Sequence, residues 1–217
     1  MATPKFGLPY VHVTWLAGLL AGDDQCRYAS WFKSHFSYKK VENPDFDSAG
    51  YKTIHNEFVQ RRAAELKADG WAVTKEGANS FKVKGKYAVV GGKPDIVAER
   101  ENRVLVVDAK TGARMAKQYW QVLTYMVMLP RSDRERFAGK DISGEVYYSN
   151  GEPVAISSGD ATPMNIDRIF AQVRECGFDM PPEKSPSETE CGFCSLPKEE
   201  CPERLATTMA IGETDEF

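Results

Sequence analysis

The sequence has little of what marks a membrane protein or a secreted protein. No stretch approaches the ~20 consecutive apolar residues that a membrane span needs, and the first residues do not join a charged segment to an apolar one as signal peptides do. There is no internal repeat. We therefore expect a cytoplasmic protein without a membrane partner. With 217 residues and 42% apolar content, the chain is long enough to bury one full core.

An excess of basic residues, the usual footprint of nucleic-acid binding, is also missing from the chain as a whole, because its formal net charge is −3. The charges are unevenly distributed, however. Residues 182–217 hold nine acidic and three basic residues, a net charge of −6, which leaves +3 for residues 1–181. Residues 81–117 hold nine Lys or Arg and four Asp or Glu, a net charge of +5 that suits phosphate contact. The alternating lysines near the start of this segment are also compatible with a plain solvated strand.

Two apolar, β-branched segments in this region predict a hairpin. Ile96–Glu99 and Arg103–Val107 are separated by the polar dipeptide Glu101-Asn102, which fits a two-residue loop. Facing positions in that register sum to 203, so Asp95 lies across from Asp108. Directly paired residues have Cβ atoms roughly 4.5–5.5 Å apart, close enough for two carboxylates to hold one divalent cation.

A lysine joins the two acids. Side chains alternate along a strand, so Lys110 projects to the same face as Asp108. Two buried carboxylates repel each other, and Mg²⁺ or Mn²⁺ would remove that repulsion and lower the pKa of a bound water. Lys110 would then orient this water or stabilise negative charge at phosphorus. The alternative is a solvated hairpin in which the lysine forms an ion pair with one acid.

Further elements surround the hairpin in the sequence. A helix is expected from Arg114 to Leu129, stopped by Pro130, with Lys117, Gln121 and Tyr125 along a side that could line a cleft or be a half-exposed polar flank.

A long helix is expected from Ser48 to near Gly70, with Ile54, Phe58, Ala64 and Leu66 as its apolar side and His55 beside the core. For this histidine, a structural role competes with metal ligation. Strands at residues 71–74 and 81–90 are expected to join the hairpin's sheet. A second hairpin, at residues 145–148 and 154–156, is expected to extend it.

Four elements, taken in order, resemble the motifs of the PD-(D/E)xK nuclease superfamily in its RecB-like branch: Gly50-x-x-x-x-His55, Gly92-Lys93-Pro94-Asp95, Asp108-Ala109-Lys110 and Gln121-x-x-x-Tyr125. The resemblance implies a restriction-endonuclease-like α/β fold, in which a mixed central sheet is flanked by helices. It also implies metal-dependent hydrolysis of phosphodiester bonds in DNA.

The resemblance assigns a role to each residue. The expected ligands of Mn²⁺ or Mg²⁺ are His55, Asp95, Asp108 and the carbonyl of Ala109, and an imidazole ligand suits Mn²⁺ better. Lys110 would serve the nucleophilic water, and Gln121 with Tyr125 would position the substrate. The expected nucleic-acid contacts in the basic region are Lys93, Arg114 and Lys117.

Three of the five cysteines are clustered as Cys191-x₂-Cys194-x₆-Cys201. In a cytosolic chain such a cluster favours metal binding over disulfides. A tetrahedral zinc or a four-iron cluster takes four thiolates, so either Cys26 or Cys176 must supply the fourth.

The resemblance points to Cys26. In the CRISPR-associated iron-sulfur exonucleases and in nuclease subunits of bacterial recombination complexes, one early cysteine joins three C-terminal ones around a [4Fe-4S] cluster. Such a cluster would join the N- and C-terminal segments here, with zinc as the alternative. The element Cys26-Arg27-Tyr28 lacks the proline that often follows this cysteine, and the six-residue last gap also departs slightly from the family's pattern.

These observations divide the chain into an N-terminal helical segment with one cluster cysteine, a nuclease core, a cysteine-rich segment and an acidic, flexible tail, at residues 1–47, 48–180, 181–204 and 205–217. The expected activity is exonucleolytic cleavage of single-stranded DNA or DNA ends, in CRISPR adaptation or DNA repair, with protein partners in a DNA-processing complex. Two alternatives remain: a non-catalytic nucleic-acid-binding or assembly module of the same fold, and a zinc-stapled RNA nuclease.

Overall fold

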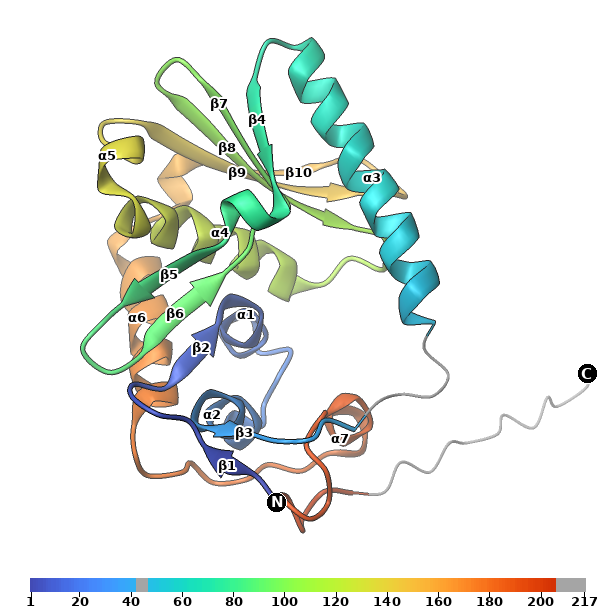
Figure 1. Cartoon of the computed structure of the whole chain (residues 1–217), viewed down its shortest axis with the longest axis vertical. Helices are drawn as coiled ribbons and strands as arrows, with labels where there is room; N and C mark the ends of the chain where they lie inside the picture. Colours follow the sequence, from blue (N-terminus) through green and yellow to red (C-terminus); the bar gives the residue numbers. More distant parts are fainter. Residues whose placement is uncertain (42–46, 206–217) are drawn as a thin grey trace, which may run out of the picture.

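A five-stranded mixed sheet lies at the centre of the computed structural model, which describes residues 1–41 and 47–205 (Figure 1). Its order is β10-β9-β8-β7-β4, and β8 and β9 are parallel while the other neighbours are antiparallel. Helices flank both faces, so the predicted α/β fold with a mixed central sheet is confirmed. The strands are β4 (Ala72–Lys75), β7 (Ile96–Arg100), β8 (Arg103–Lys110), β9 (Asp141–Tyr148) and β10 (Val154–Ile156).

The hairpin of β7 and β8 has the predicted register. Ile96 pairs with Val107 and Arg100 pairs with Arg103, so the facing positions sum to 203. Glu101, in the two-residue loop, has a φ of 57°, a left-handed conformation that tight hairpin turns require. The hairpin therefore fixes, by local pairing alone, which residues of β8 face each side of the sheet.

One face of the sheet is covered by α3 (Ser48–Ala68). The buried side chains between them are Phe58, Val59, Ala63 and Leu66 of the helix and Ile96, Ala98, Val107 and Ala109 of the sheet. The expected apolar side was partly wrong, because Ile54 is 59% exposed and Ala64 is exposed too. Relative to the expected orientation the helix is rotated, so that Val59 and Ala63 face the sheet instead of Ile54 and Ala64.

The other face packs against α1 (Val13–Ala21), α4 (Ala116–Ser132) and α6 (Pro163–Gly177) in the main core. Helix α4 runs through Pro130, which was expected to stop it. The proline lies in the last turn, where its missing N–H removes a single helical hydrogen bond. The N–H of Asp133 still donates to the carbonyl of Leu129 at 3.2 Å, which closes the helix two residues later.

A second, three-stranded sheet was not predicted. The strands β2 (Tyr10–His12), β6 (Val89–Gly92) and β5 (Phe81–Lys84) form it in the order β2-β6-β5. The second predicted hairpin, β9 and β10, extends the large sheet as expected. Of the strands expected at residues 71–74 and 81–90, only β4 joins that sheet, while β5 and β6 lie below it in Figure 1. The cause is a parallel pairing of β6 with β2. The strand β2 is distant from β6 in the sequence and is too short to show a periodic pattern.

The two ends of the described chain meet. The short strands β1 (Thr3–Pro4) and β3 (Phe36–Ser37) pair, and α2 (Arg27–His35) packs Trp31 and Phe32 against Leu196. The remaining helical elements are α5 (Arg134–Phe137), α7 (Glu188–Phe193) and 3₁₀ turns at Glu76–Asn79 and Ser158–Asp160. No helix in the described ranges is long and apolar enough to cross a membrane. The expected acidic tail lies outside the described residues, apart from Leu205.

We predict that Gly92→Ala destabilises the protein by about 1–3 kcal/mol, the usual cost of overpacking. A Cβ at Gly92 would lie 2.7 Å from Tyr125 Cε1 and 2.9 Å from Phe81 Cζ, so both rings must shift. Gly112→Ala is the control, because its Cβ would meet nothing within 4 Å. Urea unfolding of the two variants and the wild type measures the difference. Equal stability of the two variants would show that the ring of Tyr125 is not held against Gly92.

Candidate active site

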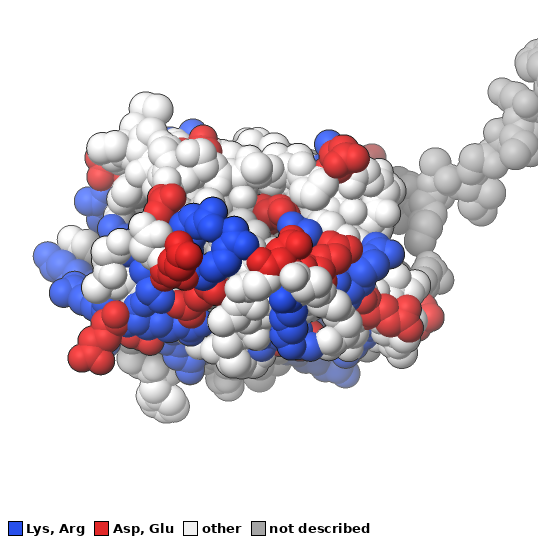
Figure 2. All heavy atoms as spheres, turned by 90° about the horizontal axis from the view of Figure 1, so that it is seen from above, with Lys and Arg blue, Asp and Glu red and all other residues white. Residues whose placement is uncertain are grey.

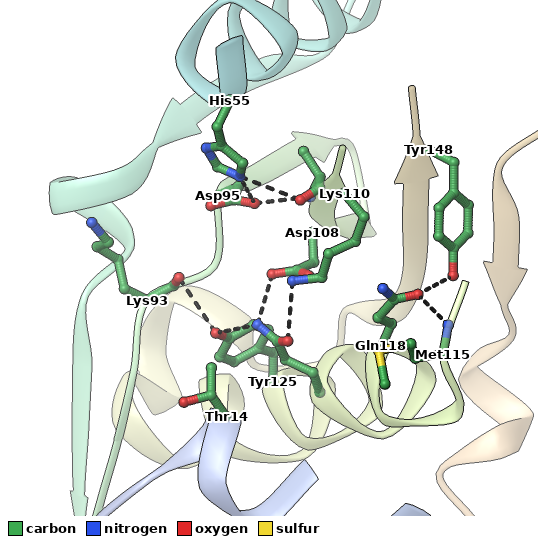
Figure 3. Close-up of polar contacts among 12 residues, drawn as sticks. Thr14, His55, Lys93, Asp95, Asp108, Lys110, Met115, Gln118, Tyr125 and Tyr148 are labelled. Atoms are coloured by element: carbon green, nitrogen blue, oxygen red, sulfur yellow. Dashed lines mark hydrogen bonds and ion pairs between the residues drawn. The ribbon is translucent and has the colours of Figure 1, made fainter. Parts of the chain in front are cut away.

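The two predicted carboxylates meet at the carboxyl end of β8. Asp95 directly precedes β7, and its Oδ2 accepts a hydrogen bond from the backbone N–H of Ala109 at 2.8 Å. That bond ties Asp95 to the residue next to Asp108 (Figure 3). Both residues are buried, Asp108 with only 2% of its surface exposed. The hairpin register, predicted from the turn, is what brings them together.

Asp108 is held by a lysine and an amide. Its Oδ2 lies 2.5 Å from Lys110 Nζ, and its Oδ1 accepts a hydrogen bond from Gln121 Nε2 at 2.9 Å. Although Oδ2 is buried beside the ammonium, no hydrogen bond of good geometry reaches it among the described residues. Burial raises the pKa of Asp108 to about 6; the charge of Lys110 opposes that rise and the charge of Asp95 adds to it. This carboxylate is therefore poised to accept a further positive charge.

The lysine keeps its charge in spite of its surroundings. Burial lowers the pKa of Lys110, but the carboxylate of Asp108 outweighs burial and leaves the pKa above its ordinary value. Lys110 Nζ also donates to Gln121 Oε1 at 3.2 Å. One amide thus contacts both members of the ion pair, which fixes the orientation of the lysine toward the carboxylates.

His55 of α3 approaches the same point from the opposite side of the hairpin. Its Nε2 lies 3.3 Å from the carbonyl oxygen of Ala109 and 3.4 Å from Asp95 Oδ2. The hydrogen bond to Asp95 raises the pKa of His55, while burial opposes the rise. Tyr51, one turn earlier on the helix, stacks on the imidazole with ring centroids 5.9 Å apart. Sequence reasoning missed Tyr51, although its i, i+4 spacing to His55 is a usable signal.

Tyr125 completes the cluster below the carboxylates. Gln121 Nε2 lies 3.2 Å from its hydroxyl, which in turn donates to the carbonyl of Lys93 at 3.5 Å. Burial raises the pKa of this phenol far above its ordinary value, so it stays protonated. Figure 3 shows the ammonium of Lys93 pointing away from Tyr125.

Two expected nucleic-acid contacts lie elsewhere. Arg114 donates to the carbonyl of Glu152 at 2.7 Å and stacks its guanidinium over Tyr148, 4.6 Å from the ring centroid. Lys117 bonds through its backbone N–H to Asp23 Oδ2 at 3.0 Å and lines a cavity beside α2 rather than the carboxylates. Of the three residues, only Lys93 is joined to the carboxylate cluster, through its carbonyl.

Gln118 is a structural residue that sequence reasoning missed. Its Oε1 accepts from the hydroxyl of Tyr148 at 2.6 Å and from the N–H of Met115 at 2.9 Å. Its Nε2 donates to the carbonyl of Ala113 at 2.9 Å. These bonds fold the loop that follows Lys110 back onto the sheet. A glutamine one turn before Gln121 gives no distinguishing signal, because the loop conformation is not encoded in helical spacing.

The cysteines fall into two places. A cavity of about 340 Å³ between α2 and the C-terminal segment is lined by Cys26, Cys191, Cys194 and Cys201. Cys176 lies apart, on a separate cavity, and burial raises the pKa of its thiol to about 12.

A carboxylate closes the first cavity at one side. Glu190 accepts hydrogen bonds from the backbone N–H groups of Gln25, at 2.6 Å, and Cys26, at 2.9 Å. This contact fixes the start of α2 against α7, so the early cysteine is held beside the three late ones.

The carboxylate cluster fits a divalent cation by its chemistry. It offers two carboxylates, an imidazole and a backbone carbonyl, and one buried carboxylate oxygen of Asp108 accepts no hydrogen bond. In the part of the chain that the structure describes, no three His, Cys, Asp or Glu side chains are arranged as a metal site. Protein partners occupy the carboxylate oxygens instead: Lys110 at Asp108, and the N–H of Ala109 at Asp95.

Comparisons with known proteins bear on the family and the fold of the chain. A family model described as "PD-(D/E)XK nuclease superfamily" matches residues 20–201. The solved structure "Crystal structure of SSO0001" is similar in fold, with a TM-score of 0.52 and 14% identity over 93% of this chain and 90% of that one.

A structure of Archaeoglobus fulgidus Hjc, a Holliday junction resolvase from an archaeal hyperthermophile, has a TM-score of 0.28 and 17% identity over 49% of this chain and 74% of that one. That likeness is too low to carry an argument. No curated protein matches the chain significantly.

We predict that the metal-free protein loses stability as the pH rises from about 4 to about 6. The pKa of Asp108 is 3.8 ordinarily and about 6 in the fold, so the folded state binds this proton more tightly and is stabilised at low pH. The loss is up to about 3 kcal/mol, from about 1.4 kcal/mol per pKa unit. The pKa of His55 is also raised above its ordinary value of 6.5, so protonated His55 likewise stabilises the folded state. That stabilisation is lost only as the pH rises above 6.5.

The control is Asp108→Asn, which removes only the first of these two groups. Urea unfolding in EDTA at closely spaced pH values should show a smaller fall for this variant between about pH 4 and pH 6. Parallel curves for variant and wild type would contradict the raised pKa.

Proposed function

The chain belongs to the PD-(D/E)XK nuclease superfamily, and from that premise we propose that it is a divalent-metal-dependent nuclease that hydrolyses phosphodiester bonds in DNA. The observation that carries the proposal is the buried group at the end of β8, where Asp95, Asp108 and Lys110 lie within one hydrogen-bonded network. A purely structural role would favour apolar residues here, because a buried ion pair stabilises a fold weakly or not at all.

His55, Asp95, Asp108 and the carbonyl of Ala109 would hold the cation, Mn²⁺ or Mg²⁺. When bound, it would neutralise the two carboxylates and lower the pKa of a bound water. The protein's own groups do the rest. Lys110 stays protonated beside the carboxylates, so it can donate a hydrogen bond to the attacking water and stabilise negative charge on the phosphate. Gln121 accepts a hydrogen bond from Lys110 and contacts the protonated Tyr125 in turn, and these two side chains would position the substrate.

The substrate we propose is single-stranded DNA or a DNA end, cleaved as an exonuclease of the RecB-like branch in CRISPR adaptation or DNA repair, with protein partners. The support is the set of four motifs in their order and the net charge of +5 in residues 81–117. Labelled single-stranded DNA, double-stranded DNA and RNA of one sequence, incubated with Mn²⁺, Mg²⁺ or EDTA, test this choice. Equal cleavage of circular and linear single strands would argue for an endonuclease.

We predict that Asp108→Ala abolishes cleavage because one of the two acidic ligands is lost. Lys110→Ala should abolish cleavage as well, yet leave Mn²⁺ binding intact or slightly tighter, since a nearby positive charge is removed. Cleavage assays and calorimetric Mn²⁺ titration of both variants separate the two roles. Lys67→Glu, on an exposed turn of α3, is the control for altered surface charge.

Two results would contradict this mechanism. Undiminished cleavage in EDTA would remove the metal from it. Loss of Mn²⁺ binding in Lys110→Ala would mean that the lysine organises the carboxylates instead of serving the water.

We further propose that Cys26, Cys191, Cys194 and Cys201 bind a [4Fe-4S] cluster, with zinc as the alternative. The support is that all four line one cavity and that Cys176 does not. A cluster with one ligand from α2 and three from the C-terminal segment would close a very long loop and stabilise the contact between the ends of the chain.

We predict that protein purified without oxygen is brown and loses its colour on Cys26→Ala but not on Cys176→Ala. Cys176 serves as the matched control because its thiol is buried in apolar packing and protonated. Absorbance together with iron and zinc analysis makes the measurement. Colourless protein with one zinc would favour the zinc alternative, and a brown Cys26→Ala protein would move the fourth ligand elsewhere.

A further inference from the structure

The three-stranded sheet has one face that the carboxylate cluster does not use. Val11, Val90 and Phe81 are buried in the main core. Because side chains alternate along a strand, their neighbours lie on the opposite side. We call that side the basic sheet face: Tyr10 and His12 of β2, Val89 and Gly91 of β6, and Lys82 and Lys84 of β5.

The ring of Tyr10 reaches over Gly91 on this face. A Cβ at Gly91 would come within 1.7 Å of the Tyr10 hydroxyl and 2.9 Å of Tyr10 Cε2, so the ring covers the glycine. The ammonium of Lys82, which pairs in register with Gly91, lies 5.7 Å from the centroid of the same ring. A partly exposed aromatic ring flanked by a cation is a suitable platform for an unpaired base.

The basic sheet face is continuous with the active site. Lys93 follows β6 directly and precedes Pro94 and the carboxylate of Asp95. His12 lies at the matching end of the parallel strand β2, opposite Gly91.

Beyond His12 a second aromatic ring continues the surface. The rings of His12 and Trp15 are 5.8 Å apart, and Lys5 Nζ is 5.8 Å from the centroid of Trp15. Trp15 is half-buried near the start of α1.

The positive charges along this surface are not neutralised. Within residues 1–41 and 47–205, no acidic side chain forms an ion pair with Lys5, Lys40, Lys82, Lys84 or Lys93. Burial lowers the pKa of His12, and the charges of Lys40 and Lys93 lower it further. Charges of one sign that are held close together without acids are relieved by a polyanion.

The end of the molecule at the β7–β8 turn differs. Figure 2 shows Lys and Arg interleaved with Asp and Glu there. Arg136 and Lys140, for example, both pair with Glu99. A surface whose charges already pair with one another gives little attraction for phosphates, so we assign the nucleic acid to the small sheet instead.

We propose that the basic sheet face, extended by Lys93, Trp15 and Lys5, binds the single strand of DNA that leads to the catalytic carboxylates. Lys82, Lys84 and Lys93 contact its phosphates, and Tyr10 and Trp15 stack on its bases. A duplex hides the faces of its bases, so the partly exposed rings favour a single strand. This inference rests on the proposed nuclease function and adds the path of the substrate.

Binding of a fluorescent single-stranded DNA to the full chain in EDTA, followed by anisotropy at several salt concentrations, tests the proposal without cleavage. Lys84→Glu should weaken binding by about fivefold to tenfold and lower the salt slope by about 0.7 for each phosphate that is no longer neutralised. Trp15→Leu should weaken binding with little change in the salt slope, because stacking is uncharged. Lys67→Glu is the matched control, an exposed lysine that also forms no ion pair within the described residues.

Cleavage of a long single strand with Mn²⁺ distinguishes this inference from the proposed function. Raised KM with unchanged kcat in Lys84→Glu supports the inference. If the wild-type protein binds single-stranded DNA through Lys84 but never cleaves it, the inference is supported and the nuclease proposal is refuted. Wild-type affinity in Lys84→Glu, an equal loss in Lys67→Glu, or tighter binding of a duplex or of RNA would each overturn it, whether or not the protein cleaves.

Discussion

Burial of the Asp108–Lys110 ion pair is the constraint on which the rest of the site depends. An ion pair removed from water is costly unless its remaining donors and acceptors are satisfied. Helix α4 satisfies them with one amide, since Gln121 contacts both the carboxylate and the ammonium. That contact requires α4 to lie directly on β8, and the close approach in turn needs glycine at position 92, where a side chain would strike Tyr125. One carboxylate oxygen of Asp108 still accepts no hydrogen bond of good geometry, although it lies beside the ammonium of Lys110.

The two sheets have different roles in the proposed function, and a short backbone segment joins them. The large sheet fixes the carboxylates through the β7–β8 hairpin, while the small sheet presents lysines and aromatic rings on a face with no acidic partners in the described ion pairs. Lys93 and Pro94 connect the last strand of the small sheet to Asp95. In the proposed function, substrate binding and chemistry would therefore depend on one continuous segment of backbone, whose geometry is set by β6 on one side and β7 on the other.

Packing between the ends of the chain gives the molecule a second region of interest. Trp31 and Phe32 of α2 enclose Leu196, and Glu190 accepts two backbone N–H groups at the start of α2. The contacts of Glu190 join segments 164 and 165 residues apart, so closing the intervening loop has a large entropic cost. The four cysteines line the cavity at this junction, where a bound metal group would add to the contacts that hold it closed.

The sequence by itself determined what depends on local spacing. The register of β7 and β8 follows from a two-residue loop, and Gln121 meets Tyr125 because they are one helical turn apart. Tertiary structure alone decided the rest. The pairing of β2 with β6, and with it the separate small sheet, joins distant segments too short to show a period. Lys117 was expected to line the cleft with Gln121 and Tyr125, but its backbone N–H bonds to Asp23 and it lines the cavity beside α2. Such choices are made by which distant surfaces bury each other best, and no window of sequence contains both partners.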